Sequence, residues 1–136
     1  MANLRVNLDT AIYNVLNVLA VNNVATGGVF NTMAPPNAKL PYVVFQLISK
    51  QDEHSFNGRF GNAVYMAKAI SRSAWPKEAA TIDTQIDTAL EDATLAITGF
   101  TQLVCRREQD ISYVEERTGE LFHHIGGLYR IMADQT

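Results

Sequence analysis

Apolar residues recur at helical spacing in two segments of the chain. The first segment covers residues 8–21 and is followed by Gly27-Gly28. The second opens at Pro76, which suits the first position of a helix, and ends before Gly99. Each segment has one apolar stripe, so two amphipathic helices are predicted. The stripes consist of Leu8, Ile12, Val15, Leu16 and Leu19 in the first helix and Ala79, Ile82, Ile86, Ala89, Leu90 and Ala93 in the second.

The remaining apolar residues follow the two-residue alternation of β-strands. Gly126-Gly127, inside the last of these segments, predicts a bulge or a close backbone approach. The element order predicts one α+β domain over residues 1–136, with a mainly antiparallel sheet of four to five strands and two helices packed on one face. The predicted strands are 29–31, 42–49, 63–72, 100–107, 111–115 and 121–132, with a long polar loop at 50–62 and turns at 108–110 and 118–119.

The strand at 42–49 is apolar on both of its faces. Val43, Phe45 and Leu47 point to one face, and the other face is also mostly apolar. Two helices cover one face of a sheet, so the second face is predicted to be an interface for self-association. A core role for any one of these residues is an equally open alternative. The interface candidates are Val44, Ile48, Val64, Met66 and Ile70.

The composition is that of an ordinary globular domain. Hydrophobic residues make up 47% and charged residues 18% of the 136 residues, which argues against wholesale disorder. The net charge is −3 and the eleven Lys and Arg are scattered, so a strong nucleic-acid footprint is not expected. No apolar run approaches the roughly 20 residues of a membrane span, and the first residues lack the order of a signal peptide. A soluble protein made in the cytoplasm is therefore expected.

The residue types that most often carry catalysis form no known motif. His123 and His124 are adjacent on a predicted strand and point to opposite faces, so they cannot chelate one ion and no metal site is predicted. Cys105 lies mid-strand and is predicted to be a buried structural thiol. The glycine-rich segment 58–61 lacks the context of a phosphate cradle. We therefore predict neither an enzyme nor a cofactor.

The second predicted helix carries a row of carboxylates. Asp83, Asp87 and Glu91 recur at four-residue spacing opposite the apolar stripe. Like charges at this spacing repel by a few tenths of a kcal/mol per pair. Two interpretations stay open, a solvated helix face and a surface kept negative for a purpose.

Several motifs follow one another in a familiar order after the first helix. They are Val29-Phe30-Asn31, Ala34-Pro35, Leu40-Pro41-Tyr42-Val43-Val44-Phe45, Leu47-Ile48-Ser49, the strand 65–70, Trp75-Pro76-Lys77-Glu78-Ala79-Ala80 and Leu128-Tyr129-Arg130-Ile131. In this order and spacing the chain resembles the tail-terminator family of siphophages, also called tail-completion proteins. The resemblance spans nearly the whole chain. The charged segment 108–120, His123-His124 and Gly126-Gly127 match no motif of that family.

The resemblance implies a structural protein of a phage tail or neck. Family members form a ring, usually a hexamer, that caps the tail tube, meets the head–neck connector or stopper protein, and lets DNA pass without specific binding. It also implies residence in the virion, and in the host cytoplasm during assembly. Asp83, Asp87 and Glu91 are then candidates for the lumen lining. The loop 50–62 is a candidate arm for docking on the tail tube, through Phe56, Arg59 and Phe60.

Two alternatives to a tail terminator stay open. A head-completion or stopper protein shares the virion but occupies a different position in the neck. A small α+β ligand-binding domain or enzyme needs a convergent polar cluster, which the sequence does not reveal.

Overall fold

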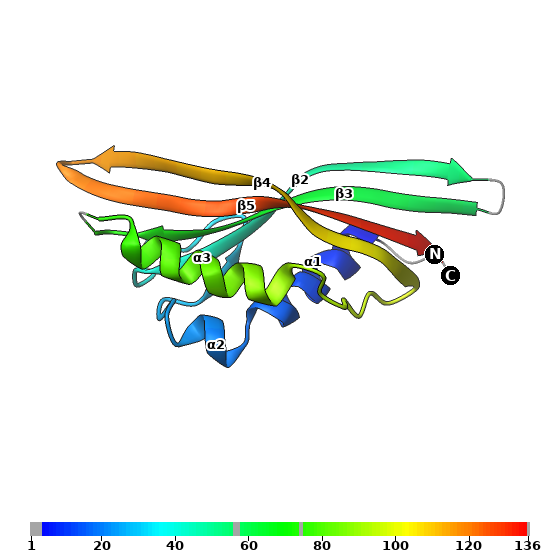
Figure 1. Cartoon of the computed structure of the whole chain (residues 1–136), viewed down its shortest axis with the longest axis horizontal. Helices are drawn as coiled ribbons and strands as arrows, with labels where there is room; N and C mark the ends of the chain where they lie inside the picture. The colour runs from blue at the N-terminus through cyan, green and yellow to red at the C-terminus, as the bar shows by residue number, and fades with distance from the viewer. Residues whose placement is uncertain (1–3, 56–57, 74, 136) are drawn as a thin grey trace.

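The computed structural model describes residues 4–55, 58–73 and 75–135 and is organised around one sheet of five strands (Figure 1). The strands lie in the order β1-β2-β3-β5-β4, with β1 parallel to β2 and the other neighbours antiparallel. The predicted α+β fold with a mainly antiparallel sheet is confirmed. In chain order the elements are α1 Leu4–Leu16, α2 Leu19–Asn22, β1 Val29–Asn31, β2 Tyr42–Ser55, β3 Gly58–Ser71, α3 Lys77–Leu90, β4 Phe100–Arg117 and β5 Glu120–Gln135.

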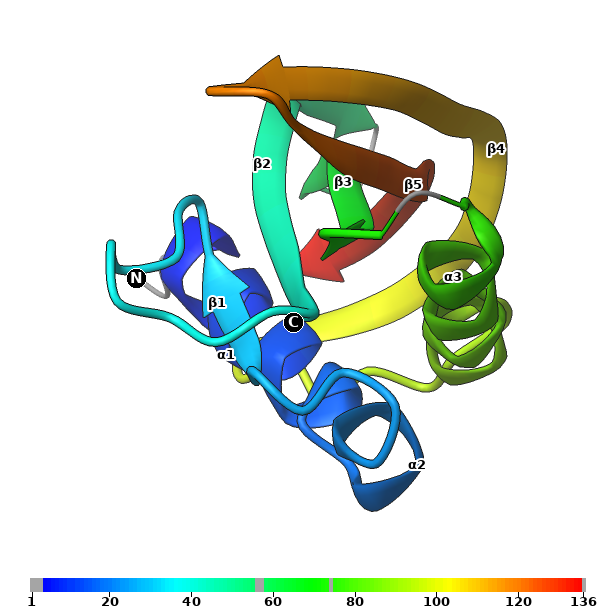
Figure 2. The same cartoon turned by 90° about the vertical axis from the view of Figure 1, so that its left-hand side faces the viewer.

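The helices lie on one side of the curled sheet and close the core against it (Figures 1 and 2). Leu8 and Leu16 of α1 and Ile82 and Ile86 of α3 have no exposed surface. Because side chains alternate along a strand, every second residue in the part of the strands that the helices cover points toward them. The buried strand residues of this layer are Val43, Phe45, Ala63, Tyr65, Ala67, Ala69, Cys105, Tyr129, Ile131 and Ala133.

The first predicted helix is divided into two in the structure. Helix α1 begins at Leu4 and ends at Leu16, and Val18 adopts an extended conformation with φ −120° and ψ 161° before α2 begins. The Asn22 side chain donates a hydrogen bond to Asn17 Oδ1 across this break at 3.0 Å. Leu19, the last member of the predicted stripe, is consequently turned outward and is 75% exposed.

The predicted loop at 50–62 is wrong, because most of this segment is strand. β2 continues to Ser55 and β3 begins at Gly58, with Lys50 paired to Ala63 and Asp52 to Gly61. β3 also pairs with β5 as far as Phe60, opposite Asp134. The polar residues of the segment 50–62 suggested a loop. Backbone pairing of β3 with β2 and β5 instead makes this segment an extension of the sheet.

The two strands predicted at 100–107 and 111–115 are one strand, β4. The turn predicted at 108–110 is wrong, since the polar residues there lie at a register shift between Arg107 and Gln109 within the β4–β5 pairing. The turn at Thr118-Gly119 is confirmed, and both residues have positive φ, 47° and 81°. A bulge absorbs one extra residue without ending a strand, which explains why the polar signal was misread.

The glycine pair in β5 permits close packing, as predicted. A Cβ at Gly126 would lie 2.1 Å from the Ala67 carbonyl oxygen of β3 and 2.5 Å from the Lys68 Cα. A Cβ at Gly127 would lie 2.5 Å from Nε of Arg107. Gly126 therefore sets the approach of β5 to β3, and Gly127 leaves room for the guanidinium of Arg107.

Candidate interaction surfaces

The sheet face that turns away from the helices contains a groove of about 560 Å³. Its floor is formed by alternate residues of β2, β3 and β5, and the segment 32–40, which follows β1, forms part of its wall. This segment covers a portion of the face that the pattern predicted to be bare. The groove is lined by Thr32, Met33, Ala34, Pro35, Pro36, Ala38, Leu40, Tyr42, Val44, Gln46, Met66, Lys68, Ile70, Arg72, Arg117, Phe122 and His124.

The five predicted interface residues differ in their exposure. Val44 and Ile70 are only 4% and 7% exposed, so the chain itself already buries them. Val64 and Met66 are half-buried. Ile48 is 50% exposed, and it lies where the β2–β3 register shifts between Leu47 and Ser49. Among the five, Ile48 therefore offers the largest share of its side chain to another molecule.

All charged side chains among the described lining of the groove are basic. Lys68 Nζ donates a hydrogen bond to the Tyr113 hydroxyl at 2.6 Å and lies 5.1 Å from the centre of that ring. Arg117 pairs with Glu115 at 2.9 Å, whereas Arg72 reaches Glu120 only at 3.5 Å between two exposed side chains. Lys68 is thus the lining cation that has no carboxylate partner among the described residues, whereas Arg117 and Arg72 pair with glutamates beside the groove.

His124 is buried beside the groove in contact with the β4–β5 hairpin. Its Nε2 lies 2.9 Å from Oε1 of Glu115, and its ring stacks on Tyr113 with centroids 4.4 Å apart. Its Nδ1 is buried without a hydrogen-bond partner among the described residues. Burial lowers the pKa of His124 below its ordinary value, and the nearby Lys68 adds to this, although Glu115 acts in the opposite direction. His124 is therefore neutral at neutral pH.

Arg107 joins α3 to the sheet through a group of polar side chains. Its guanidinium donates to both carboxylate oxygens of Asp83 at 2.9 and 3.0 Å and to the Gly126 carbonyl at 2.6 Å. The Tyr129 hydroxyl accepts a bond from Arg107 at 3.1 Å and donates one to Asp87 at 2.9 Å. Bidentate pairs of this kind are the stronger class of ionic hydrogen bond.

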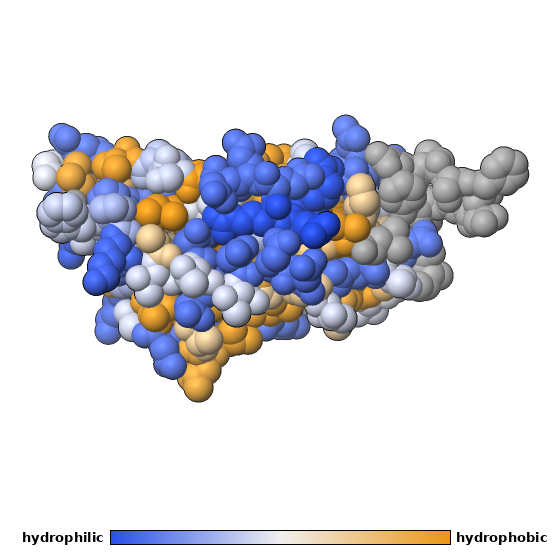
Figure 3. All heavy atoms as spheres, in the orientation of Figure 1, coloured by the Kyte–Doolittle hydropathy of each residue, from blue (hydrophilic) through white to orange (hydrophobic). Residues whose placement is uncertain are grey.

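The acidic row of α3 is therefore not a free solvated face. Asp83 is only 17% exposed and is paired with Arg107, while Asp87 is 44% exposed. Glu91 accepts a hydrogen bond from the Arg107 backbone N–H at 2.6 Å. The row faces β4, where a hydrophilic band crosses the surface over β4 and α3 (Figure 3). Contacts with Arg107 inside the chain therefore offset much of the negative charge of these carboxylates.

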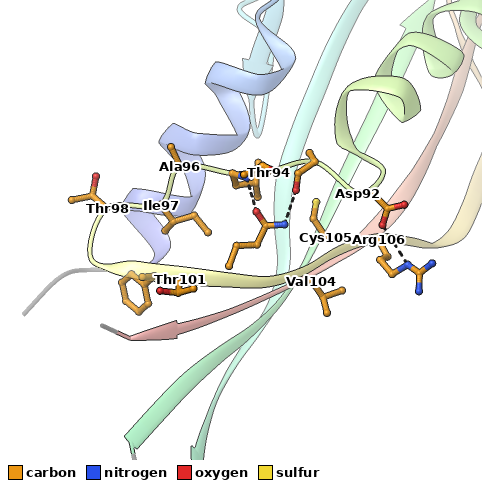
Figure 4. A pocket seen from close by; sticks show the side chains of 13 residues that line it. Asp92, Thr94, Ala96, Ile97, Thr98, Thr101, Val104, Cys105 and Arg106 are labelled. Carbon is orange, nitrogen blue, oxygen red and sulfur yellow. Dashed lines mark hydrogen bonds and ion pairs between the residues drawn. The ribbon is translucent and has the colours of Figure 1, made fainter.

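A second hollow, of about 830 Å³, lies between the segment after α3 and the start of β4 (Figure 4). Gln102 crosses it, accepting a hydrogen bond from the Leu95 N–H at 2.5 Å and donating one to the Ala93 carbonyl at 2.6 Å. Cys105 is buried and donates to the Leu90 carbonyl at 3.2 Å. Burial raises the pKa of its thiol to about 11, so it is not a reactive thiolate. The prediction of a structural cysteine is confirmed.

Two of the three candidate docking residues lie near the end of the β2–β3 hairpin. Phe56 lies outside the described residues. Arg59 and Phe60 belong to β3, where they pair with His54 and Glu53 of β2. In the part of the chain that the structure describes, no three His, Cys, Asp or Glu residues could hold a metal ion, and no helix is long and apolar enough to cross a membrane.

Sequence reasoning missed the basic residues that the fold brings together. Lys68 and Arg72 share the alternation of Met66 and Ile70 on one strand, so period two could have placed them on the second face. Arg117 and His124 reach the same groove only through the pairing of β4 with β5 and of β5 with β3. No local pattern in the sequence predicts that pairing.

The chain is similar to known proteins over most of its length. The family model described as tail completion protein gp17 matches residues 10–126. Among solved structures 20 chains match. One, from the virion of a native gene transfer agent particle, has a TM-score of 0.79 at 15% identity and covers 98% of both chains. Another, which carries no functional name, has a TM-score of 0.56 at 11% identity and covers 93% of this chain and 94% of its own. At these identities the likeness concerns the fold alone. No curated protein sequence matches significantly.

Replacing Arg107 with Met should destabilise the fold by about 3 kcal/mol, because it leaves the mostly buried Asp83 without its partner. Arg106→Met is the matched control, since Arg106 is 67% exposed and its carboxylates lie 3.7 and 3.8 Å away. The control should change the free energy of unfolding by at most about 0.5 kcal/mol. Urea denaturation measures both. Equal losses in the two variants would contradict the proposed role of Arg107.

The lowered pKa of His124 predicts a pH-dependent stability. A group whose pKa is lower in the folded state stabilises the fold above its unfolded value, 6.5, and this contribution is lost as the pH falls through the folded value. Wild-type protein should therefore lose more thermal stability between about pH 7.5 and pH 5.5 than His124→Phe, which keeps a ring against Tyr113 but does not titrate. Thermal denaturation at both pH values checks this. The other histidines are common to both proteins, so identical losses would contradict the assignment.

Proposed function

The chain belongs to the tail completion protein gp17 family, so it is a structural protein of a phage tail rather than an enzyme, and from this premise we propose that it forms a ring that caps the tail tube. The ring, a hexamer in this proposal, joins the tube to the head–neck connector or stopper protein. The protein is then part of the virion and is present in the host cytoplasm during assembly.

The observation that carries this proposal is that the chain belongs to this family and has two long hairpins at opposite ends of its sheet (Figure 1). In the first hairpin β2 ends at Ser55 and β3 begins at Gly58, and the β4–β5 hairpin turns at Thr118-Gly119. A subunit that binds like copies at its sides and different partners above and below needs separate surfaces for each. The two hairpins and the grooved face of the sheet offer such surfaces.

In this proposal the tip of the β2–β3 hairpin docks on the tail tube. Phe56, Arg59 and Phe60 lie at or beside this tip in the sequence, and aromatic and arginine side chains contribute much of the binding energy at protein interfaces. The tip is the only part of the predicted arm that extends past the pairing of β3 with β5, within the described residues, because that pairing begins at Phe60.

DNA passes through the lumen of the proposed ring without specific binding. Each chain carries a net charge of −3, and clustered Lys and Arg are what phosphate contacts require. The candidate lumen residues Asp83, Asp87 and Glu91 contribute less free charge than their number suggests, since Arg107 pairs with Asp83 and lies 3.6 Å from Asp87. Weak, salt-sensitive repulsion of DNA is therefore expected rather than adhesion.

The second candidate is a head-completion or stopper protein. The same cationic groove and paired hairpins suit a subunit that sits one position further from the tube. The two candidates differ in a binding test. A terminator ring binds purified tail tubes, and a stopper binds the head connector but no tube.

Ile48→Arg should convert the ring into a folded monomer, because Ile48 is half exposed on the second face and a charge there would be desolvated at a subunit contact. Light scattering after size exclusion gives the mass, and thermal denaturation checks the fold. Leu19→Arg is the control, since Leu19 is 75% exposed on the helical side and should leave the ring intact. A wild-type monomer at micromolar concentration would refute the ring itself. A ring that survives Ile48→Arg but not Leu19→Arg would move the interface to the helices.

Phe56→Ser combined with Phe60→Ser should leave the ring assembled but prevent capping of the tube. Electron microscopy of assembled particles should then show tails of irregular length or tails without heads. Val114→Ser, which removes an exposed apolar side chain from the β4–β5 hairpin, is the control and should give normal tails at the tube end. Normal tails with the double variant would show that another surface holds the tube.

A further inference from the structure

We propose that the groove between β2, β3, β5 and the segment 32–40 receives an acidic surface of a second copy of this chain. The contact is head-to-tail, because the groove of one copy meets a different surface of the next. This inference rests on the proposed ring. It names the face of the subunit that contacts the neighbouring copy and the charges that hold the two copies together.

Charge complementarity identifies the occupant. Three of the eleven Lys and Arg line the groove, and none of the fourteen Asp and Glu is among its described lining. Arg117 and Arg72 pair with Glu115 and Glu120 beside it, so Lys68 is the cation that a carboxylate from outside would complete.

The rest of the chain is correspondingly more acidic than the overall charge of −3. Exposed carboxylates lie there: Glu116 is exposed, and the side chains of Asp110 and Asp92 are 86% and 72% exposed although Arg107 and Arg106 approach them within the chain. A second copy therefore presents the acidic surface that this groove attracts.

Within one chain, the ammonium group of Lys68 has no carboxylate partner among the described residues. It lies at the centre of the sheet, paired in register with Val44 on one side and Gly126 on the other. Its ammonium group contacts the Tyr113 hydroxyl and ring, and none of the described carboxylates pairs with it. An ammonium group held over apolar residues such as Val44, Met66 and Ile70 gains most from a carboxylate that is brought in from outside.

His124 adds a second unfilled position in the same groove. It is 4% exposed, and its Nδ1 has no hydrogen-bond partner among the described residues, although Nε2 contacts Glu115. With Nε2 donating to Glu115, Nδ1 of the neutral ring is an acceptor and would take a donor rather than a carboxylate. The apolar floor and Lys68 together suit a segment that brings both apolar and acidic side chains.

The sign of the charge also fixes the symmetry of the contact. Two copies of the same cationic groove repel each other, so they cannot meet face to face in a two-fold dimer. A contact between the groove and a different surface is heterologous, and such contacts close into rings when the rotation between copies allows it. The groove therefore favours the ring over a simple dimer.

The test is the charge reversal Lys68→Glu combined with Arg72→Glu, compared with Lys77→Glu. Lys77 lies at the first position of α3, outside the groove, and its reversal also lowers the net charge. The groove variant should raise the dissociation concentration of the ring by more than about tenfold, whereas Lys77→Glu should leave it within about twofold. Light scattering across a concentration series at about 0.15 M salt measures this, and thermal denaturation verifies that each variant is folded.

A milder variant separates charge from local structure. Lys68→Gln keeps a hydrogen-bond donor near Tyr113 but removes the charge, so it should weaken the ring less than the reversal and should reduce its sensitivity to salt. If wild-type protein forms a ring and the reversed variant forms the same ring at the same concentration, the inference is overturned while the proposed function stands. If that variant forms normal rings that no longer bind connector or tube, the occupant is a different protein and the second copy is excluded. A wild-type monomer would instead defeat the proposed function.

Discussion

The architecture depends on a sheet that is apolar on both faces while its helices cover only one of them. On the covered face, alternate residues of β2, β3 and β5 pack against α1 and α3 and form the continuous core. On the other face, Val44 and Ile70 are buried although no helix lies over them, since the segment 32–40 lies beside them. Apolar surface left in water weakens folding by roughly 25 cal/mol per Å², so on this face, which no helix covers, a non-helical segment packs instead. What this segment does not fill is the groove.

Charge is distributed according to the same two faces. On the helical side Arg107 lies between α3 and the sheet, where Asp83, Tyr129 and a backbone carbonyl satisfy its donors. On the groove side Lys68, Arg72 and Arg117 line a hollow without a described carboxylate in its wall. A buried cation that is fully bonded fixes one packing of its own chain, whereas Lys68, which contacts no described carboxylate, is available to another molecule. The first cluster therefore serves the fold, and the second is the one that we propose serves the assembly.

Backbone details decide how the strands reach these positions. Gly126 and Gly127 let β5 lie close to β3 and leave room for Arg107, and register shifts in β2 and β4 redirect the side chains that follow them. Such local changes matter because a shift of one residue exchanges the two faces of a strand. The exposed Ile48 and the bonding of Arg107 both lie at such shifts. Family membership then gives these surfaces their context in a phage tail.

The sequence by itself determined the elements whose signal is local. The apolar stripe of α3, the alternation of β2 and β3, the turn at Thr118-Gly119, the buried Cys105 and the α+β fold follow from periodicity and turn chemistry, and the ordered motifs identified the family. Only the tertiary structure decided where the polar segments belong. Residues 50–55 and 58–62 became strand because neighbouring strands satisfy their backbone groups, and the carboxylates of α3 turned inward because Arg107, 24 residues from Asp83, lies opposite them. The groove depends on register between strands that are distant in the chain, and register is a property of pairing that no single segment encodes.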